Sequence, residues 1–196
     1  MTERLRAVAL ASASPRRREL LRALGLDVTI VSSAYDERSH EKWSASPAQL
    51  ALENAVGKAA CAEQAGPPVL LAADTIVDLD GQAFGKPNSS SQAGAMLRGL
   101  RGRRHTVHTG YVVMDRRSGR RVAAVQSAQV EFLDIEDAVI DRYVETGEPM
   151  DKAGAYGVQG LGALLVSSIA GDFYTVMGLP IARIGLACAT LGYELL

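Results

Sequence analysis

The sequence contains few of the residues that build disulfides and metal sites. It has only two cysteines and three histidines among 196 residues. Cys61 and Cys188 are far apart and match no metal-ligand or CxxC spacing, so we expect both to be buried thiols in a reducing cytosol. His40, His105 and His108 have no neighbour at a spacing typical of zinc ligands. Neither a disulfide-stabilised secreted fold nor a zinc site is therefore expected.

Long apolar runs and an excess of charge of one sign are also missing. No run of about 18 apolar residues is free of charge, so no transmembrane helix is expected, and the N-terminus has no signal-peptide core. Twenty-one Lys and Arg against twenty-two Asp and Glu give a net charge of −1. This balance argues against a surface that attracts nucleic acid or an anionic membrane as a whole. With 47% hydrophobic and 22% charged residues, the composition predicts a single globular domain over 1–196, in the cytoplasm.

The most informative feature that is present is a basic helix start at residues 12–21. Residues 8–11 form an apolar run of strand length, and a helix is expected directly after it. Ser14 is a favourable N-cap and Pro15 a favourable first helical residue. The first turns of that helix then carry three consecutive cations, Arg16, Arg17 and Arg18.

Three arginines at this end of a helix oppose its dipole. The N-terminus of a helix already carries partial positive charge, so each cation there costs roughly 0.3–1 kcal/mol. A bound phosphate would reverse the sign, because it would meet backbone N–H groups, hydroxyls and guanidinium groups together. We therefore infer an anion site at the start of this helix.

The remaining pattern mixes strands, hairpins and helices. Helices are expected at 47–64, 89–100, 134–146 and 180–191, and residues 33–46 read as a polar surface loop containing Asp36, Glu37, Glu41 and Trp43. Asp80-Gly81 predicts a hairpin turn. Strands are expected at 8–11, 27–31, 69–78, 106–115, 122–133 and 164–166. This order favours an α/β or α+β fold in which helices pack on a mixed sheet.

Carboxylates provide a second candidate group. Asp74 follows a buried apolar strand, at the end where α/β proteins usually place their chemistry. Together with Asp36 and Glu37, it offers hard oxygen ligands for Mg²⁺ beside phosphate oxygens. Taken alone, Asp74 is better interpreted as a turn-forming residue before a hairpin, and the loop acids as solvated side chains.

Several familiar motifs fail on inspection. Residues 81–87 are not a Walker A loop, because the spacing is one residue short and Pro87 replaces the Ser or Thr. Residues 157–162 resemble a dinucleotide fingerprint only loosely, and the basic residues 101–105 read as an exposed turn. No Ser-His-Asp set is apparent.

Four segments together resemble the Maf family of nucleoside triphosphate pyrophosphatases. They lie in the family's order and spacing and span nearly the whole chain: Ala11-Ser-Ala-Ser-Pro-Arg-Arg-Arg-Glu-Leu-Leu21, Ala73-Asp-Thr-Ile-Val77 with Gly85-Lys-Pro87, residues 147–160, and Val176-Met-Gly-Leu-Pro180. The resemblance implies a curved mixed β-sheet with flanking helices in two lobes around a cleft, similar to inosine triphosphatase, and a homodimer.

The resemblance also implies an activity and a set of residues. Members of the family cleave a nucleoside triphosphate to the monophosphate and pyrophosphate with Mg²⁺ or Mn²⁺. The proton-accepting aspartate falls on Asp74, and its partner in the metal site on Glu37. The phosphate-binding residues fall on Ser12, Arg16, Arg17, Lys58 and Lys86.

Three positions resemble the branch of the family that acts on dTTP and UTP, namely Arg17, Thr75 and Gln159. The Gln159 amide can donate and accept at once, as the edge of a pyrimidine requires. The substrates thus expected are dTTP, UTP and modified pyrimidine triphosphates. Two alternatives stay open, which are hydrolysis of 7-methyl-GTP and a nucleotide-binding regulator of septum formation without required turnover.

Overall fold

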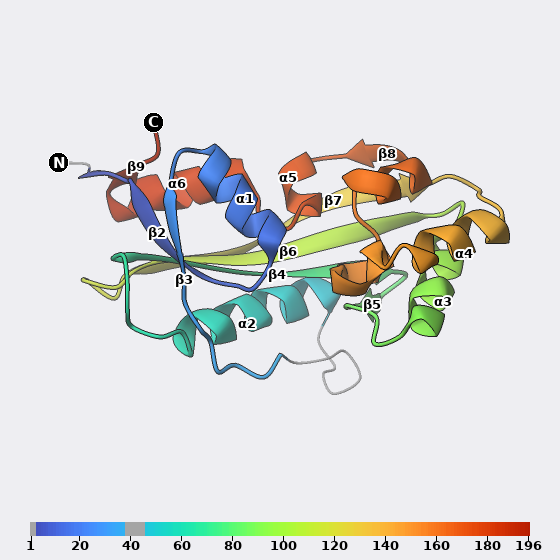
Figure 1. The fold of residues 1–196 in the computed structure, drawn as a ribbon. Helices are drawn as coiled ribbons and strands as arrows, with labels where there is room; N and C mark the ends of the chain where they lie inside the picture. The colour runs from blue at the N-terminus through green and yellow to red at the C-terminus, as the bar shows by residue number, and fades with distance from the viewer. Residues whose placement is uncertain (1–2, 38–45) are drawn as a thin grey trace.

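The computed structural model describes residues 3–37 and 46–196 as a mixed sheet flanked by helices (Figure 1). The sheet has seven strands, with β5 (Gln82–Phe84) paired to the edge of β4. The other six lie in the order β3 (Asp27–Ile30), β2 (Ala7–Ala11), β4 (Val69–Leu79), β6 (Arg104–Asp115), β7 (Arg121–Phe132) and β8 (Val166–Ala170). The predicted α/β class with a mixed sheet and flanking helices is confirmed.

The sheet changes character at β4. On one side of it, β2 pairs parallel with both β3 and β4, whereas β6, β7 and β8 continue antiparallel on the other side. Nearly every residue of β4 is buried, as expected for a central strand that is covered on both faces. Asp80 and Gly81 form the predicted hairpin turn to β5, both with positive φ as a type I′ turn requires.

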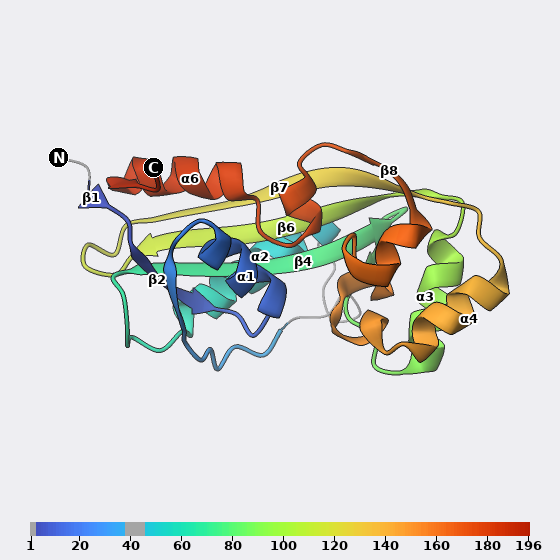
Figure 2. The ribbon, with the colours of Figure 1, turned by 45° about the horizontal axis from the view of Figure 1, so that its top comes forward.

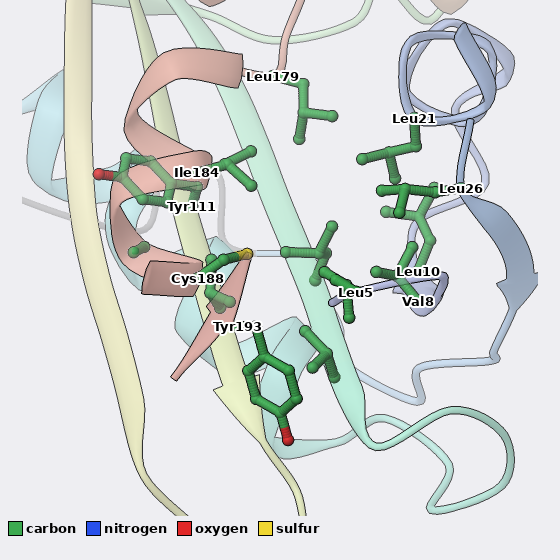
Figure 3. Packing of buried hydrophobic residues seen from close by; sticks show 14 of the residues in the cluster. Leu5, Val8, Leu10, Leu21, Leu26, Tyr111, Leu179, Ile184, Cys188 and Tyr193 are labelled. Atoms are coloured by element: carbon green, nitrogen blue, oxygen red, sulfur yellow. The ribbon is translucent and has the colours of Figure 1, made fainter. Parts of the chain in front are cut away.

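Helices cover both faces of the sheet. The helices α1 (Pro15–Ala23) and α6 (Ile181–Leu191) lie on one face, and α2 (Pro47–Ala60) lies on the other (Figure 1). In the core of the first face, Leu21 of α1 and Ile184 of α6 pack around Leu10 and Leu71 of the sheet (Figure 3). Alanines of α2 form the opposite core with Leu70 and other alternate residues of the same strands.

A third cluster closes the far end of the sheet. Here α3 (Ser90–Leu100) and α4 (Asp137–Glu145) lie side by side (Figure 2), and their leucine and isoleucine side chains pack on Val77 and Phe132. The chain ends meet at the opposite end, where β1 (Glu3–Arg4) pairs with β9 (Tyr193–Glu194). No helix of the described residues is long and apolar enough to cross a membrane.

One edge of β4 is interrupted, and this interruption positions the site. The strand β2 pairs with β4 only at Leu70–Ala72, and β5 pairs with it only at Val77–Leu79. Within the described residues, the intervening segment 73–76 has no strand partner on that edge. Asp74 and Thr75 therefore lie at a break in the sheet.

Three sequence expectations need correction or limits. Cys61 is exposed rather than buried, because α2 ends at Ala60 and not near residue 64, so that Cys61 lies at its C-cap; Cys188 is buried as expected. Residues 160–165 form the 3-10 helix η4 (Gly160–Leu165), and the strand begins only at Val166. The expected loop at 33–46 is described as far as Glu37, so His40, Glu41 and Trp43 lie outside the described residues.

Candidate functional site

A cleft of about 760 Å³ lies at the break in the sheet, where β2 leads into α1. The nine residues to which the family resemblance assigns roles all line it: Ser12, Arg16, Arg17, Glu37, Lys58, Asp74, Thr75, Lys86 and Gln159. Asp36 does not line it. A second hollow of about 880 Å³ adjoins it between α2, β5 and α3. Glu37, Asp74, Thr75 and Lys86 line both, and so mark the boundary between them.

Asp74 is held in place by two side chains of α2. Its Oδ1 accepts a hydrogen bond of 2.7 Å from Lys58 Nζ, and its Oδ2 accepts one of 3.0 Å from Asn54 Nδ2. Asn54 and Lys58 are four residues apart on one helix face, so both reach the same carboxylate. All three side chains are buried. With a partner on each oxygen, the Asp74 carboxylate has a fixed orientation in the floor of the cleft.

Lys58 also binds the second candidate carboxylate. Its Nζ lies 2.9 Å from Glu37 Oε1, so one ammonium group bridges Glu37 and Asp74. Partial burial raises the pKa of Glu37, but the charge and hydrogen bond of Lys58, with smaller contributions from Lys86 and Arg17, lower it more. The net pKa lies below the ordinary value, which keeps Glu37 ionised near neutral pH.

Arg17 is buried and hydrogen-bonded to the protein through all three guanidinium nitrogens. Its Nε donates to the Gly178 carbonyl at 2.7 Å, and its terminal nitrogens donate to Ser12 Oγ at 3.0 Å and Thr75 Oγ1 at 2.9 Å. Burial lowers its pKa, and the charge of Asp74 offsets part of this. Arg17 thus ties the start of α1 to β4 and to the segment before α6.

A chain of hydroxyl groups continues from Arg17 through the sheet. Thr75 and Thr109 lie opposite each other on β4 and β6, with their hydroxyl oxygens 2.9 Å apart. Thr109 donates to the Thr175 carbonyl at 2.8 Å, so Thr75 must donate to Thr109 and accept from Arg17. The direction of these hydrogen bonds fixes the orientation of the Thr75 hydroxyl group, which lies at the wall of the cleft.

Arg16 has a different environment from Arg17. Its side chain is part-exposed and reaches across to the 3-10 helix η2 (Glu148–Asp151), where it donates to Asp151 Oδ2 at 2.8 Å and to the Asp151 carbonyl at 3.2 Å. Lys152 binds the other oxygen of the same carboxylate at 2.7 Å. Asp151 therefore balances two cations at the side of the cleft, Arg16 and Lys152.

The start of α1 offers the predicted anion site. Ser14 is the N-cap and accepts from the Arg17 backbone N–H, and Pro15 is the first helical residue, as the sequence predicts. Residues 11–17 line the cleft, so the partial positive charge of this helix end lies beside it. Arg16 and Lys86 line the same cleft, so two cationic side chains and this helix end face one space.

Gln159 reaches the cleft from the segment 157–162. Its side chain is exposed and has no hydrogen-bond partner within the described part of the chain. A ligand can therefore use both the amide N–H₂ and the carbonyl oxygen.

Sequence reasoning missed four polar residues that shape the cleft: Asn54, Glu148, Asp151 and Lys152. The spacing of Asn54, one turn before Lys58 on a helix, could have indicated the first. The other three lie in a segment quoted for the resemblance, but irregular backbone gives no periodicity from which to infer contacts.

The structure also contains a Ser-His-Asp row that the sequence did not reveal. His108 lies between Asp78 and Ser127 on three adjacent strands, at 3.2 Å from Asp78 Oδ2 and 2.7 Å from Ser127 Oγ. None of the three lines either hollow described above. The row therefore stabilises the sheet surface away from the cleft.

The carboxylates of Glu37 and Asp74 suit a divalent cation if a bound ligand supplies further oxygen atoms to the same cation. Among the described residues, no three Asp, Glu, His or Cys side chains gather as a metal site. Glu37 and Asp74 nevertheless direct oxygens at one common point, the ammonium of Lys58. Mg²⁺ is commonly bound by one or two carboxylates with phosphate oxygens and water as its other ligands. The donor set fits Mg²⁺ or Mn²⁺ in that role.

Comparison with known proteins gives one consistent result. The profile of the family described as "Maf-like protein" matches residues 7–189. The chain is 42% identical over 190 residues to a dTTP/UTP pyrophosphatase of Dictyoglomus thermophilum, covering 96% of this chain and 98% of the relative. It is 45% identical to that of Moorella thermoacetica, covering 94% and 95%. For the archaeal relative of the same name from Methanosarcina mazei, identity is 41%, covering 96% and 95%.

Proposed function

Because this chain belongs to the Maf family, we propose that it hydrolyses dTTP and UTP to the monophosphate and pyrophosphate. The observation that carries the proposal is the pair Asp74 and Glu37, bridged by Lys58 beside a basic helix start. A pure binding site for phosphates needs the cations but not two ionised carboxylates. Near-full-length relatives named for this activity support the same conclusion.

The reaction assigns separate tasks to the two sides of the cleft. Asp74, oriented by Asn54 and Lys58, accepts a proton from the attacking water at the α-phosphate. When bound by Asp74 and Glu37, a divalent cation supplies Lewis-acid charge to phosphate oxygens. Arg16, Lys86 and the N–H groups of α1 neutralise the charge that develops on the leaving pyrophosphate.

The wall of the cleft that carries Gln159 and Thr75 selects the base. We assign Gln159 the contact with the carbonyl and N3–H edge of a pyrimidine, and Thr75 a hydroxyl contact beside it. Arg17 supports this wall by fixing Thr75 and Gly178, besides adding positive charge. The same proposal includes a single cytoplasmic domain over 1–196, with two lobes around the cleft as in inosine triphosphatase, acting as a homodimer.

Pyrophosphate release tests the proposal directly. The purified protein should release pyrophosphate from dTTP and UTP faster than from GTP or 7-methyl-GTP, and only with added Mg²⁺ or Mn²⁺. Asp74→Asn keeps the side-chain size but removes the base, and should lower kcat by roughly 10²-fold or more. The matched control is Asp78→Asn, four residues along β4 and outside the cleft, which should stay within about twofold.

Each other outcome has a defined meaning. Unchanged turnover in Asp74→Asn would contradict the role of Asp74. Preferred hydrolysis of 7-methyl-GTP would replace the proposed substrate. Tight binding of one nucleotide without turnover of any would favour the regulator of septum formation over the enzyme.

A further inference from the structure

The segment that carries Gln159 is anchored by a carboxylate on a different element. Glu148 begins η2, and its Oε2 accepts a hydrogen bond of 3.0 Å from the Leu161 backbone N–H. Its Oε1 accepts from the Gly162 N–H at 3.1 Å and from the Tyr143 hydroxyl at 3.0 Å. Hydrogen bonds to an ionised carboxylate are about twice as strong as those between neutral groups. One side chain therefore fixes two consecutive amides that begin two residues after Gln159.

The backbone of the segment is built to fit this carboxylate. Gly160 has φ +68°, and a Cβ there would lie 3.0 Å from Glu148 Oε2. A Cβ on Gly162 would lie 2.4 Å from the Gly157 carbonyl oxygen and 2.6 Å from the Tyr143 hydroxyl. The segment thus folds back on itself against Glu148: a side chain at Gly162 would clash with backbone, and one at Gly160 would be strained by the positive φ and would crowd the Glu148 carboxylate.

Glu148 is itself fully engaged within the protein. Burial raises its pKa, but the amides of Gly162 and Leu161 and the Tyr143 hydroxyl lower it more, so the pKa lies below the ordinary value. Both oxygens are used by three donors, while the neighbouring Gln159 amide faces the cleft without a partner in the described residues. The arrangement separates the group that holds the segment from the group that is free to meet a ligand.

We propose that Glu148 is a positioning residue for base recognition: it fixes residues 157–162 so that Gln159 faces the cleft, and thereby sets the preference for pyrimidine triphosphates. This inference rests on the proposed function. Tyr143 assists through its hydrogen bond to Oε1. The Glu148 carboxylate binds Tyr143 and the amides of Leu161 and Gly162, and none of these belongs to the phosphate-binding wall made by α1 and Lys86.

Glu148→Gln is the test, because it keeps the size of the side chain but turns an N–H₂ group toward one of the backbone donors. Losing one such hydrogen bond corresponds to roughly a five- to tenfold change in an equilibrium constant. We expect KM for dTTP to rise by about that factor with kcat within about twofold. The ratio of kcat/KM for dTTP over GTP should fall similarly, while inhibition by inorganic tripolyphosphate, which has no base, stays unchanged.

Two further measurements keep the proposal falsifiable. Amide hydrogen exchange at Leu161 and Gly162 should accelerate in Glu148→Gln, and Tyr143→Phe should shift the dTTP/GTP ratio in the same direction by a smaller factor. Glu145→Gln, at an exposed glutamate that ends α4, is the matched control and should change nothing. If Glu148→Gln does not fold, Tyr143→Phe alone decides by the same ratio.

An unchanged dTTP/GTP ratio in the folded variant overturns the proposal. So does a loss of tripolyphosphate inhibition equal to the loss for dTTP, because that would show general loosening of the cleft. Failure of the proposed function is a separate result: the unsubstituted protein would then release no pyrophosphate from dTTP or UTP.

Discussion

Lys58 joins the two carboxylates on which the proposed chemistry depends. Replacing it with glutamine would remove the interaction that lowers the pKa of Glu37 and would leave Glu37 and Asp74 to repel each other. Proton uptake by Glu37 would then become easier. In Lys58→Gln we expect the acid limb of the kcat/KM profile to move up by roughly one pH unit or more, with activity partly recovered at alkaline pH.

The measurement is pyrophosphate release between pH 5 and 9 at saturating metal. Arg22→Gln removes one positive charge from an exposed position at the end of α1 and serves as the control. It should leave the profile unmoved. An acid limb that coincides in Lys58→Gln and the unsubstituted protein would show that Lys58 does not govern ionisation of the pair.

Still at the scale of residues, the sequence indicates which side chains gather at the site but not which contacts each of them makes. Arg16 and Arg17 are neighbours at a helix start, and both were expected to contact phosphate. Helix geometry points consecutive side chains in different directions, so Arg16 reaches Asp151 and Arg17 is buried against Gly178. Which contacts each arginine makes within the protein depends on residues more than 130 positions away, as the Arg16–Asp151 separation of 135 shows. No local pattern contains that information.

Whole elements were predicted where local signals are strong. The N-cap and first proline of α1, the apolar run of β4 and the Asp80-Gly81 turn all act within a few residues, and all are confirmed. Residues 164–166 were read as a strand because they are apolar. Leu164 is 70% exposed at the end of η4, so apolar character there does not reflect burial in the sheet.

The helix α2 packs very closely on the sheet, so a small side chain added between them should displace the whole helix. Gly110 of β6 faces α2, and a Cβ there would lie 2.3 Å from the Ala51 carbonyl oxygen. Gly110→Ala must push the helix outward, and α2 carries Asn54 and Lys58. We expect a loss of about 1–3 kcal/mol in the free energy of unfolding, measured in urea. We also expect a drop in kcat, because Asp74 loses its fixed partners.

Gly99→Ala is the matched substitution. Gly99 lies in α3, and the nearest heavy atom to its added Cβ is 3.9 Å away on Leu79. The higher helix propensity of alanine should raise the free energy of unfolding by up to about 1 kcal/mol, without effect on kcat. Equal stability of both variants would mean that α2 is free to shift on the sheet.

At the scale of the whole molecule, the cleft is assembled from segments distant in sequence. Arg17 reaches Gly178 and Arg16 reaches Asp151, so the start of α1 is tied to two segments of the C-terminal half. The break in the sheet that admits these contacts results from where β2 ends and β5 begins along β4. Because the site depends on this assembly, conditions that weaken the folded state should also remove activity.

Mild acid is such a condition, because the buried His105 makes the free energy of unfolding depend on pH. This histidine is 3% exposed on β6, packs edge-on against Phe132 and Tyr156, and lies 2.7 Å from the Tyr156 hydroxyl. Burial lowers its pKa from 6.5 to about 4. Between those values the unfolded chain binds a proton that the folded protein excludes. Stability should therefore fall as the pH drops from 6.5 toward 4, by up to about 3 kcal/mol.

Urea unfolding at pH 7.0, 6.0 and 5.0 measures this loss above the range in which carboxylates take up protons. His105→Gln keeps an acceptor for the Tyr156 hydroxyl but cannot titrate, so it should be less stable at pH 7 yet lose little further stability down to pH 5. His108→Gln, on the same strand and more exposed, should retain the slope, because His105 is still present. If His105→Gln and the unsubstituted protein lose stability equally over this interval, proton exclusion at His105 does not control the acid sensitivity of the fold.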